Sequence, residues 1–192
     1  MIKVDLESPH FLAKNSGWYL WTNTSSKWPF RYFMVLVDAS CRWSHVCLLS
    51  TRNVTFARLL EQIIKLRTHF FEHSIKSIRM DNADEFTSKS FDRYCASLGI
   101  EVEHPVPHVH TQNGLEEFMT KRIQVIARTL LLRTKLGSLA WGHVVLHTAK
   151  LIRICPTTLH NHSPFQLVFG HELDISHLCT FYYAVQVPIA PP

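Results

Sequence analysis

The chain has 192 residues, of which 46% are hydrophobic and 18% are charged, a balance that excludes a disordered tail and suffices for one folded domain. Its net charge of +5 suits a polyanionic partner, although many mildly basic domains bind no nucleic acid. The five cysteines include no C-x-x-C pair, which argues against a disulfide framework or a zinc ribbon and favours a reducing compartment. Because residues 1–28 lack a signal-peptide core and no apolar run reaches about 18 residues, we expect neither secretion nor a membrane span.

Hydrophobic periodicity predicts alternating strands and helices after residues 1–28, which show no clear period. The predicted strands are 31–38, 43–49, 75–80 and 100–104, and the predicted helices are 52–69, 88–98, 114–135 and 139–154. An early antiparallel pair followed by alternating helices and strands indicates a mixed α/β sheet.

Two carboxylates stand in matching contexts along this pattern. Asp81 directly follows the predicted strand 75–80, and Glu117 lies in the first turn of the helix predicted at 114–135. Carboxylates placed in this way can converge on divalent metal, and two ions about 4 Å apart can hold the attacking and leaving oxygens of a phosphodiester. The simpler interpretations are a turn-forming Asp after a strand and an exposed Glu near a helix N-terminus.

The helix predicted at 114–135 has a polar side and an apolar side. Lys121, Gln124 and Arg128 follow Glu117 at steps of four, three and four. The apolar side consists of Leu115, Met119, Ile123, Ile126 and Leu130. The polar stripe either guides DNA phosphates past Glu117 or is an ordinary solvated helix face with a Glu–Lys pair.

Five segments, in order, resemble the catalytic core of a retroelement integrase of the copia-like class, found in long-terminal-repeat retrotransposon polyproteins. They are "RYFMVLVDASCRW", "IRMDNADEFTSKSFDRYCASLGIEVEH", "HTQNGLEE", "AWGHVVLHTAKLIR" and "SPFQLVFGHE". The resemblance implies a ribonuclease-H-like mixed sheet flanked by helices. It also implies DNA integration, in which 3′-end processing and strand transfer depend on two Mg²⁺ or Mn²⁺ ions held by Asp81, Glu117 and a third carboxylate.

The loop before the helix at 114–135 is where the family carries polar, substrate-contacting residues. His110, Gln112 and Asn113 therefore join Lys121, Gln124 and Arg128 as DNA-binding candidates, although Asn113 is equally suited to cap the helix. A zinc site formed by His104, His108 and His110 is an alternative, but no Cys or carboxylate nearby in sequence completes a tetrahedral set.

The family's first catalytic aspartate has no clear counterpart. It should lie on the opening strand, near Trp18, where no acid stands; Asp5 is the nearest substitute, about a dozen residues too early. Asp38 ends a strand, but the family has an acid there that is not a metal ligand.

The stretch 18–28, reread one frame over with permitted codons, resembles the family's opening strand, so we hypothesise a frame change that damaged this strand.

We therefore expect a degenerate, truncated integrase copy with three parts. These are an irregular segment at 1–28 that replaces the first strand, a catalytic core at 29–170 and a truncated extension at 171–192. DNA and, as the family implies, further copies of the chain are the expected partners, with nuclear action and no small-molecule substrate. Activity is expected to be weak or absent. The alternatives are a non-catalytic nucleic-acid-binding remnant, an inert product that aggregates through an exposed sheet edge, and a nuclease of the same fold.

Overall fold

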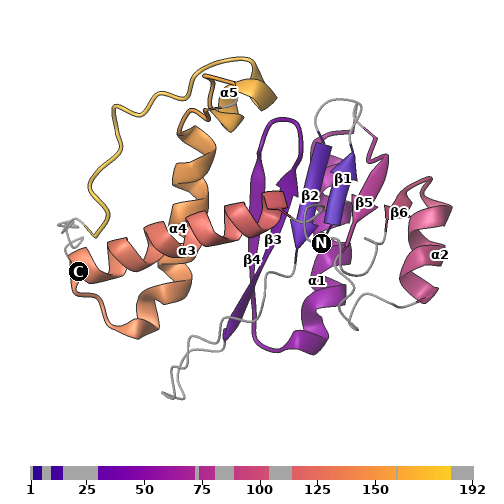
Figure 1. Cartoon of the computed structure of the whole chain (residues 1–192), viewed down its shortest axis with the longest axis horizontal. Coiled ribbons are helices and arrows are strands. Elements are labelled where there is room, and N and C mark those ends of the chain that lie inside the picture. Colours follow the sequence, from indigo (N-terminus) through magenta and orange to yellow (C-terminus); the bar gives the residue numbers. More distant parts are fainter. Residues whose placement is uncertain are drawn as a thin grey trace, which may run out of the picture.

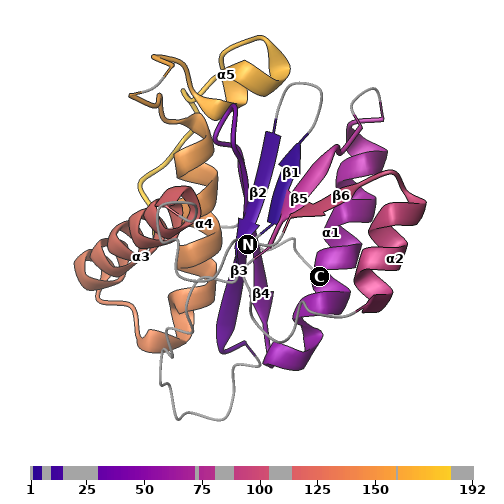
Figure 2. The ribbon, with the colours of Figure 1, turned by 45° about the vertical axis from the view of Figure 1, so that its right-hand side comes forward.

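Two neighbouring sheets, one antiparallel and one parallel, separate two layers of helices, with α3 and α4 on one face and α1 and α2 on the other (Figures 1 and 2). This computed structural model describes residues 30–71, 74–80, 89–103, 114–158 and 160–182, together with the backbone of 2–5 and 10–14. The arrangement agrees with the mixed α/β pattern of the sequence and with the ribonuclease-H-like fold that the resemblance implies.

Four antiparallel strands form the larger sheet. β1 (Ile2–Asp5), β2 (His10–Lys14), β3 (Tyr32–Asp38) and β4 (Ser44–Leu49) lie in this order across it. β5 (Ser77–Arg79) and β6 (Glu101–Glu103) form a separate parallel pair, and β5 lies beside β1 (Figure 2). The helix α2 connects β5 to β6, as parallel strands require a crossover.

The helices match the predicted pattern with small shifts at their ends. They are α1 (Thr55–His69), which follows a short 3-10 turn η1 (Arg52–Val54), α2 (Lys89–Ser97), α3 (Gly114–Thr134) and α4 (Trp141–Ile154), which follows the 3-10 turn η4 (Ser138–Ala140). None of the helices that the structure describes combines the length and apolarity needed to cross a membrane.

One further helix, α5 (Pro164–Phe169), was not predicted from the sequence. Ser163 caps it in a capping box with Gln166, Pro164 occupies its first turn, and Gly170 ends it at a φ of 75°. These are strong local signals for a helix, but six residues carry too little apolar periodicity to reveal it.

β3 is buried on both faces, because two hydrophobic cores meet at this strand. Met34 and Leu36 belong to the core beneath α1 and α2, whereas Phe33, Val35 and Val37 belong to the core beneath α3 and α4. Successive side chains of a strand point to opposite faces, so one apolar run supplies both cores. This explains why the strand is a continuous run of hydrophobic residues rather than an alternating one.

The expectation of an irregular segment at 1–28 is wrong for the residues that form β1 and β2. β2 pairs with β3 in register from Phe11 opposite Asp38 to Lys14 opposite Val35, and β1 completes a hairpin with β2. Each strand is only four or five residues long, so its own pattern is weak, and the free edge of β3 provides the pairing that the sequence does not show. β3 is consequently flanked on both sides and presents no open edge. Residues 15–29 lie outside the described residues.

Candidate functional site

The strand β5 leads toward Asp81, and its end is held by several contacts. Met80 is fully buried, and its backbone N–H donates a hydrogen bond to the Glu103 carbonyl oxygen at 3.1 Å. Beside it, the Arg79 guanidinium and the Glu103 carboxylate form an ion pair at 2.7 Å. These contacts hold the end of the parallel pair in place. Asp81 is the next residue in the chain and lies outside the described residues.

Glu117 lies in the first turn of α3, as the sequence predicts. Its side chain is half-buried, and the neighbouring Met119, Thr120 and Ile123 are buried against the sheet. α3 contacts both β2 and β3, so the packed side of the helix determines which direction Glu117 can face. The side chain of the adjacent Glu116 lies outside the described residues.

The polar stripe that continues from Glu117 is only partly solvent-exposed. Lys121 and Arg128 are exposed, as expected for groups that contact a large polyanion. Gln124 lies between them and is half-buried, and its side-chain nitrogen Nε2 is buried without a hydrogen-bond partner among the described residues. A buried amide donor without a partner is unfavourable, so Gln124 lies at the border between the packed and the exposed side of α3.

β2 lies close to the elements that carry or lead to the two predicted carboxylates. It contacts both α3, which carries Glu117, and β5, which leads to Asp81. However, its five residues, His10–Lys14, include no Asp or Glu. Within the part of the chain that the structure describes, no three His, Cys, Asp or Glu side chains gather as a metal site. Asp81 and the side chains of Asp5 and Glu116 lie outside that part.

Asp5 lies far along the sheet from Met80, the last described residue before Asp81. The strand register puts Asp5 opposite His10 and Phe11 opposite Asp38, so Asp5 lies at the end of the sheet where β3 ends. The chain runs from β4 through α1 and returns to enter β5 from that same end, as Figure 2 shows. Met80 therefore lies at the opposite end of the sheet from Asp5, and this placement does not favour Asp5 as the third carboxylate.

Asp38 uses both of its carboxylate oxygens within its own turn. Oδ1 accepts a hydrogen bond from the Ser40 backbone N–H at 3.3 Å, and Oδ2 accepts from the Cys41 backbone N–H at 2.9 Å and the Cys41 thiol at 2.5 Å. Burial raises the pKa of Asp38 to about 6, although the hydrogen bonds from Cys41 and Ser40 oppose the shift. The side chain stabilises the turn between β3 and β4, a structural role that leaves little capacity to bind metal.

Other candidates from the sequence lie outside the described residues: His104, His108, His110, Gln112 and Asn113. The sequence prediction also missed Arg42 and Arg122, which line a cavity next to the start of α3. Arg122 follows Lys121 directly, but it lies about 100° around the helix from Lys121 and so outside the stripe that begins at Glu117. No sequence signal for Arg42 exists beyond its place in a short turn.

Comparisons with known proteins support an integrase core. Residues 17–109 match the model of the integrase core domain. The chain is 31% identical over 152 residues to the retrovirus-related Pol polyprotein from transposon TNT 1-94 of Nicotiana tabacum, covering 79% of this chain and 11% of that polyprotein. It is 27% identical over 156 residues to the corresponding polyprotein from transposon RE2 of Arabidopsis thaliana, covering 79% of this chain and 10% of that polyprotein. The chain thus spans about a tenth of the length of these relatives.

A solved structure shares the fold. The simian T-cell lymphotropic virus intasome, determined in complex with the PP2A regulatory subunit B56 gamma, contains a chain that superposes with a TM-score of 0.65 at 16% identity. The match covers 94% of this chain and 60% of that chain. These matches support a retroelement integrase core, which the family model covers at residues 17–109.

Proposed function

We propose that this chain is a DNA-binding integrase core from a DNA-integrating element, and that its own strand-transfer activity is weak or absent. The observation that carries the proposal is the surface of α3, where Lys121 and Arg128 are exposed on the same side as the half-buried Glu117. The apolar side of this helix packs on β2 and β3, so the basic side is presented to the surroundings. Lys and Arg side chains on an exposed helix suit the phosphate backbone of DNA.

The lack of a carboxylate in β2 supports the loss of activity. Asp81 and Glu117 are the residues that would hold a divalent cation, which would supply the Lewis-acid chemistry of phosphoryl transfer. β2 contacts both α3 and β5 but contributes no third carboxylate. The ligand set is therefore incomplete among the described residues. The chain's own contribution is then to bind and orient DNA through α3. The core is proposed to span residues 29–170, and assembly of several copies and action in the nucleus are part of the same proposal.

Replacing both Lys121 and Arg128 by Gln should weaken binding to duplex DNA about tenfold at about 0.1 M salt, because two phosphate contacts are lost. The slope of log Kd against log salt concentration should fall by about 2 for the same reason. Fluorescence anisotropy with a labelled duplex, measured over a range of salt concentrations, checks both values.

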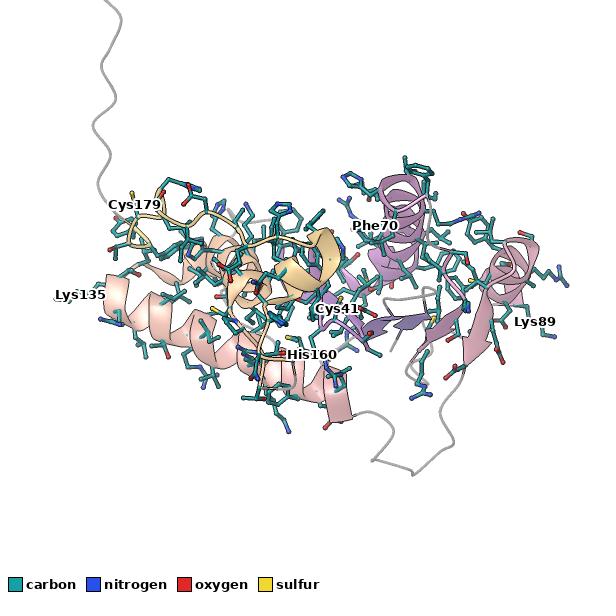
Figure 3. All side chains as sticks on the ribbon, turned by 90° about the horizontal axis from the view of Figure 1, so that it is seen from above. Cys41, Phe70, Lys89, Lys135, His160 and Cys179 are labelled. Atoms are coloured by element: carbon teal, nitrogen blue, oxygen red, sulfur yellow. The ribbon has the colours of Figure 1, made fainter. Side chains whose placement is uncertain are left out.

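The matched control replaces Lys89 and Arg93, which are exposed on α2 at the far side of the molecule from α3 (Figure 3). This pair removes the same charge, so only a localised DNA site distinguishes the two double variants. Asp81→Asn should bind duplex DNA like the wild type, since binding does not require the cation. Equal losses in both double variants would mean that the DNA contact is a diffuse effect of net charge, and no binding by the folded wild type would favour an inert product.

Mg²⁺ or Mn²⁺ should bind weakly to the wild type, with a Kd of about 10⁻³ M, because few carboxylates make a weak oxygen-ligated site. Both Asp81→Asn and Glu117→Gln should abolish this binding if the two residues share one cation. Titration calorimetry measures it directly, with Glu101→Gln on the exposed side of β6 as the control. Wild-type affinity in both site variants would contradict a shared cation, whereas tight binding of two ions would contradict the proposed loss of activity.

A further inference from the structure

A cavity of about 300 Å³ lies between the start of α3, the turn between β3 and β4, and the segment that follows α4. The described residues that line it are Arg42, Leu115, Phe118, Met119, Arg122, Pro156, Thr157 and Thr158. Figure 3 shows Cys41 and His160 together at this end of α3. The volume is at the small end of the range for ligand pockets, which begins at about 300 Å³.

The charges in this cavity are all of one sign among the described residues. Arg42 and Arg122 both line it, and no carboxylate does. Asp38, in the turn before Arg42, is engaged by this turn through both oxygens. Burial lowers the pKa of Arg42, while the charge of Asp38 raises it in part, so this guanidinium is partly desolvated. Two arginines in a cavity whose described lining holds no carboxylate favour an anion, and guanidinium groups bind phosphate with paired hydrogen bonds.

Arg42 is held in its position by the turn rather than by its side chain. Its φ is 62°, in the left-handed region that is unfavourable for a residue with a side chain. The Arg42 N–H donates to the Asp38 carbonyl at 3.1 Å, and a ring nitrogen of His160 lies 2.8 Å from the Ser40 carbonyl oxygen. Contacts from β3 and from the segment after α4 thus fix the turn on two sides. An arginine fixed in this way loses little backbone entropy on binding.

A buried hydroxyl beside the cavity lacks a partner. Thr157 Oγ1 is buried, and it makes no hydrogen bond among the described residues. The Thr157 backbone is satisfied, since its N–H donates to the His162 carbonyl at 3.1 Å. Unpaired buried polar atoms are rare in folded proteins, and a ligand in the cavity can satisfy this one.

The remaining walls are apolar and include one aromatic ring. Leu115 and Met119 come from α3 and Pro156 from the segment after α4, whereas Phe118 is 58% exposed. A ring that is so exposed beside a cavity can stack with a planar ligand, and a nucleic-acid base is such a ligand.

We propose that this cavity binds a single nucleotide unit, with the phosphate held by Arg42 and Arg122 and the base stacked on Phe118. The source of the nucleotide is either an unpaired residue at the end of a DNA strand or a free mononucleotide. The first source rests on the DNA-binding function proposed above. Arg122 lies about 100° around α3 from Lys121, so the nucleotide pocket is separate from the basic stripe that binds duplex DNA.

Titration calorimetry with dAMP and with inorganic phosphate tests the pocket without any DNA. The wild type should bind dAMP more tightly than phosphate, because only dAMP uses both the arginines and Phe118. Arg122→Gln and Arg42→Gln should each weaken both ligands about tenfold, and Phe118→Ala should weaken dAMP alone. Arg133→Gln, an exposed arginine in the last turn of α3, is the matched control and should change neither. Circular dichroism establishes that each variant is folded.

The absence of saturable dAMP binding at about 10 mM, ten times a millimolar Kd, would overturn the proposal. So would an Arg122→Gln variant that binds like Arg133→Gln. Duplexes with and without a single-stranded overhang then separate the two sources. Tighter binding of the overhang that is lost in Arg122→Gln indicates a strand end, and equal binding of both duplexes indicates a free mononucleotide. The double variant of Lys121 and Arg128 distinguishes the two proposals. If it loses duplex binding but still binds dAMP, the pocket binds its ligand independently of the basic stripe.

Discussion

Replacing Arg153 by Ala should lower the free energy of unfolding by about 2–4 kcal/mol. The Arg153 guanidinium lies over the Trp43 ring at 4.7 Å, and its Nε donates to the Ser44 carbonyl oxygen at 2.7 Å. A hydrogen bond from a charged donor contributes about 1.5–3 kcal/mol and a partly desolvated cation–π contact about 0.5–2 kcal/mol. Burial lowers the pKa of Arg153 to about 10, a value at which it remains charged at neutral pH.

The large expected effect has a structural cause, because Arg153 joins three elements. It projects from α4 onto β4, and Trp43 in turn packs against Phe165 and Phe169 of α5, at ring distances of 6.5 Å and 5.6 Å. Removing the guanidinium therefore loosens α5 as well as α4. For a chain of this length, the expected loss corresponds to a decrease in Tm of about 5–15 °C.

Urea unfolding followed by tryptophan fluorescence measures this change. Lys150→Ala, an exposed residue on the same helix, is the matched control and should lie within about 0.5 kcal/mol of the wild type. Arg153→Lys should recover less than half of the loss, since an ammonium group stacks poorly and cannot reproduce the planar guanidinium contact. A variant Arg153→Ala that is as stable as Lys150→Ala would show that the contact adds nothing to stability.

Replacing His45 by Gln should remove much of the loss of stability that the protein undergoes in mild acid. The Trp43 indole N–H donates to His45 Nε2 at 2.9 Å, which requires a neutral imidazole. Burial, together with the charges of Arg153 and His69, lowers the pKa of His45 to about 3 from its ordinary value of 6.5. The folded state therefore takes up this proton later than the unfolded state as the pH falls.

The direction of the effect follows from these two pKa values. Between about pH 6.5 and pH 3 the unfolded chain binds more protons at this position, so the contribution of His45 to stability is complete above pH 6.5 and declines below it. A pKa shift of this size changes the free energy of unfolding by about 5 kcal/mol at most. We expect a smaller change, because the ring is only half-buried. In His45→Gln the amide oxygen can still accept the indole hydrogen bond, but nothing titrates.

The measurement is the free energy of unfolding at pH 7, 5.5 and 4.5 for both proteins. The difference between wild type and variant should change steadily in favour of the variant as the pH falls. Asp38 acts in the opposite sense, because its raised pKa makes its contribution decline as the pH rises from about 4 to 6. Since Asp38 is present in both proteins, its contribution cancels in the comparison. A constant difference across this pH range would mean that His45 titrates normally.

Much of the fold could be predicted from the sequence, because its main elements carry strong local patterns. The apolar run at β3 and the amphipathic pattern of α1 and α3 appear at nearly the predicted bounds. The predicted strand at 43–49 begins one residue later, because the Trp43 carbonyl closes the turn by accepting from the Asp38 N–H at 2.8 Å. β1 and β2 could not be predicted, since strands of four and five residues depend on pairing that is remote in sequence.

The candidate site could likewise be predicted only in part from the sequence. Glu117 could be placed in the first turn of α3 and Asp81 after β5, because both positions follow from element boundaries. The cavity could not be found, because its residues come from a turn, a helix and a loop that are far apart in the chain. The strained φ of Arg42, which presents this residue to the cavity, has no signature in the sequence.

The position of β3 between the two cores has a consequence for local opening of the molecule. Breaking its hydrogen bonds to β2 or β4 exposes side chains of both cores at once, whereas α1 or α3 can separate from one core alone. The backbone amides of Met34 to Val37 should therefore exchange with deuterium only through global unfolding, and those of α2 and α5 much earlier. Ligands that bind on the α3 side should slow amide exchange there. They should leave amide exchange on the α1 side unchanged, unless they stabilise β3 itself.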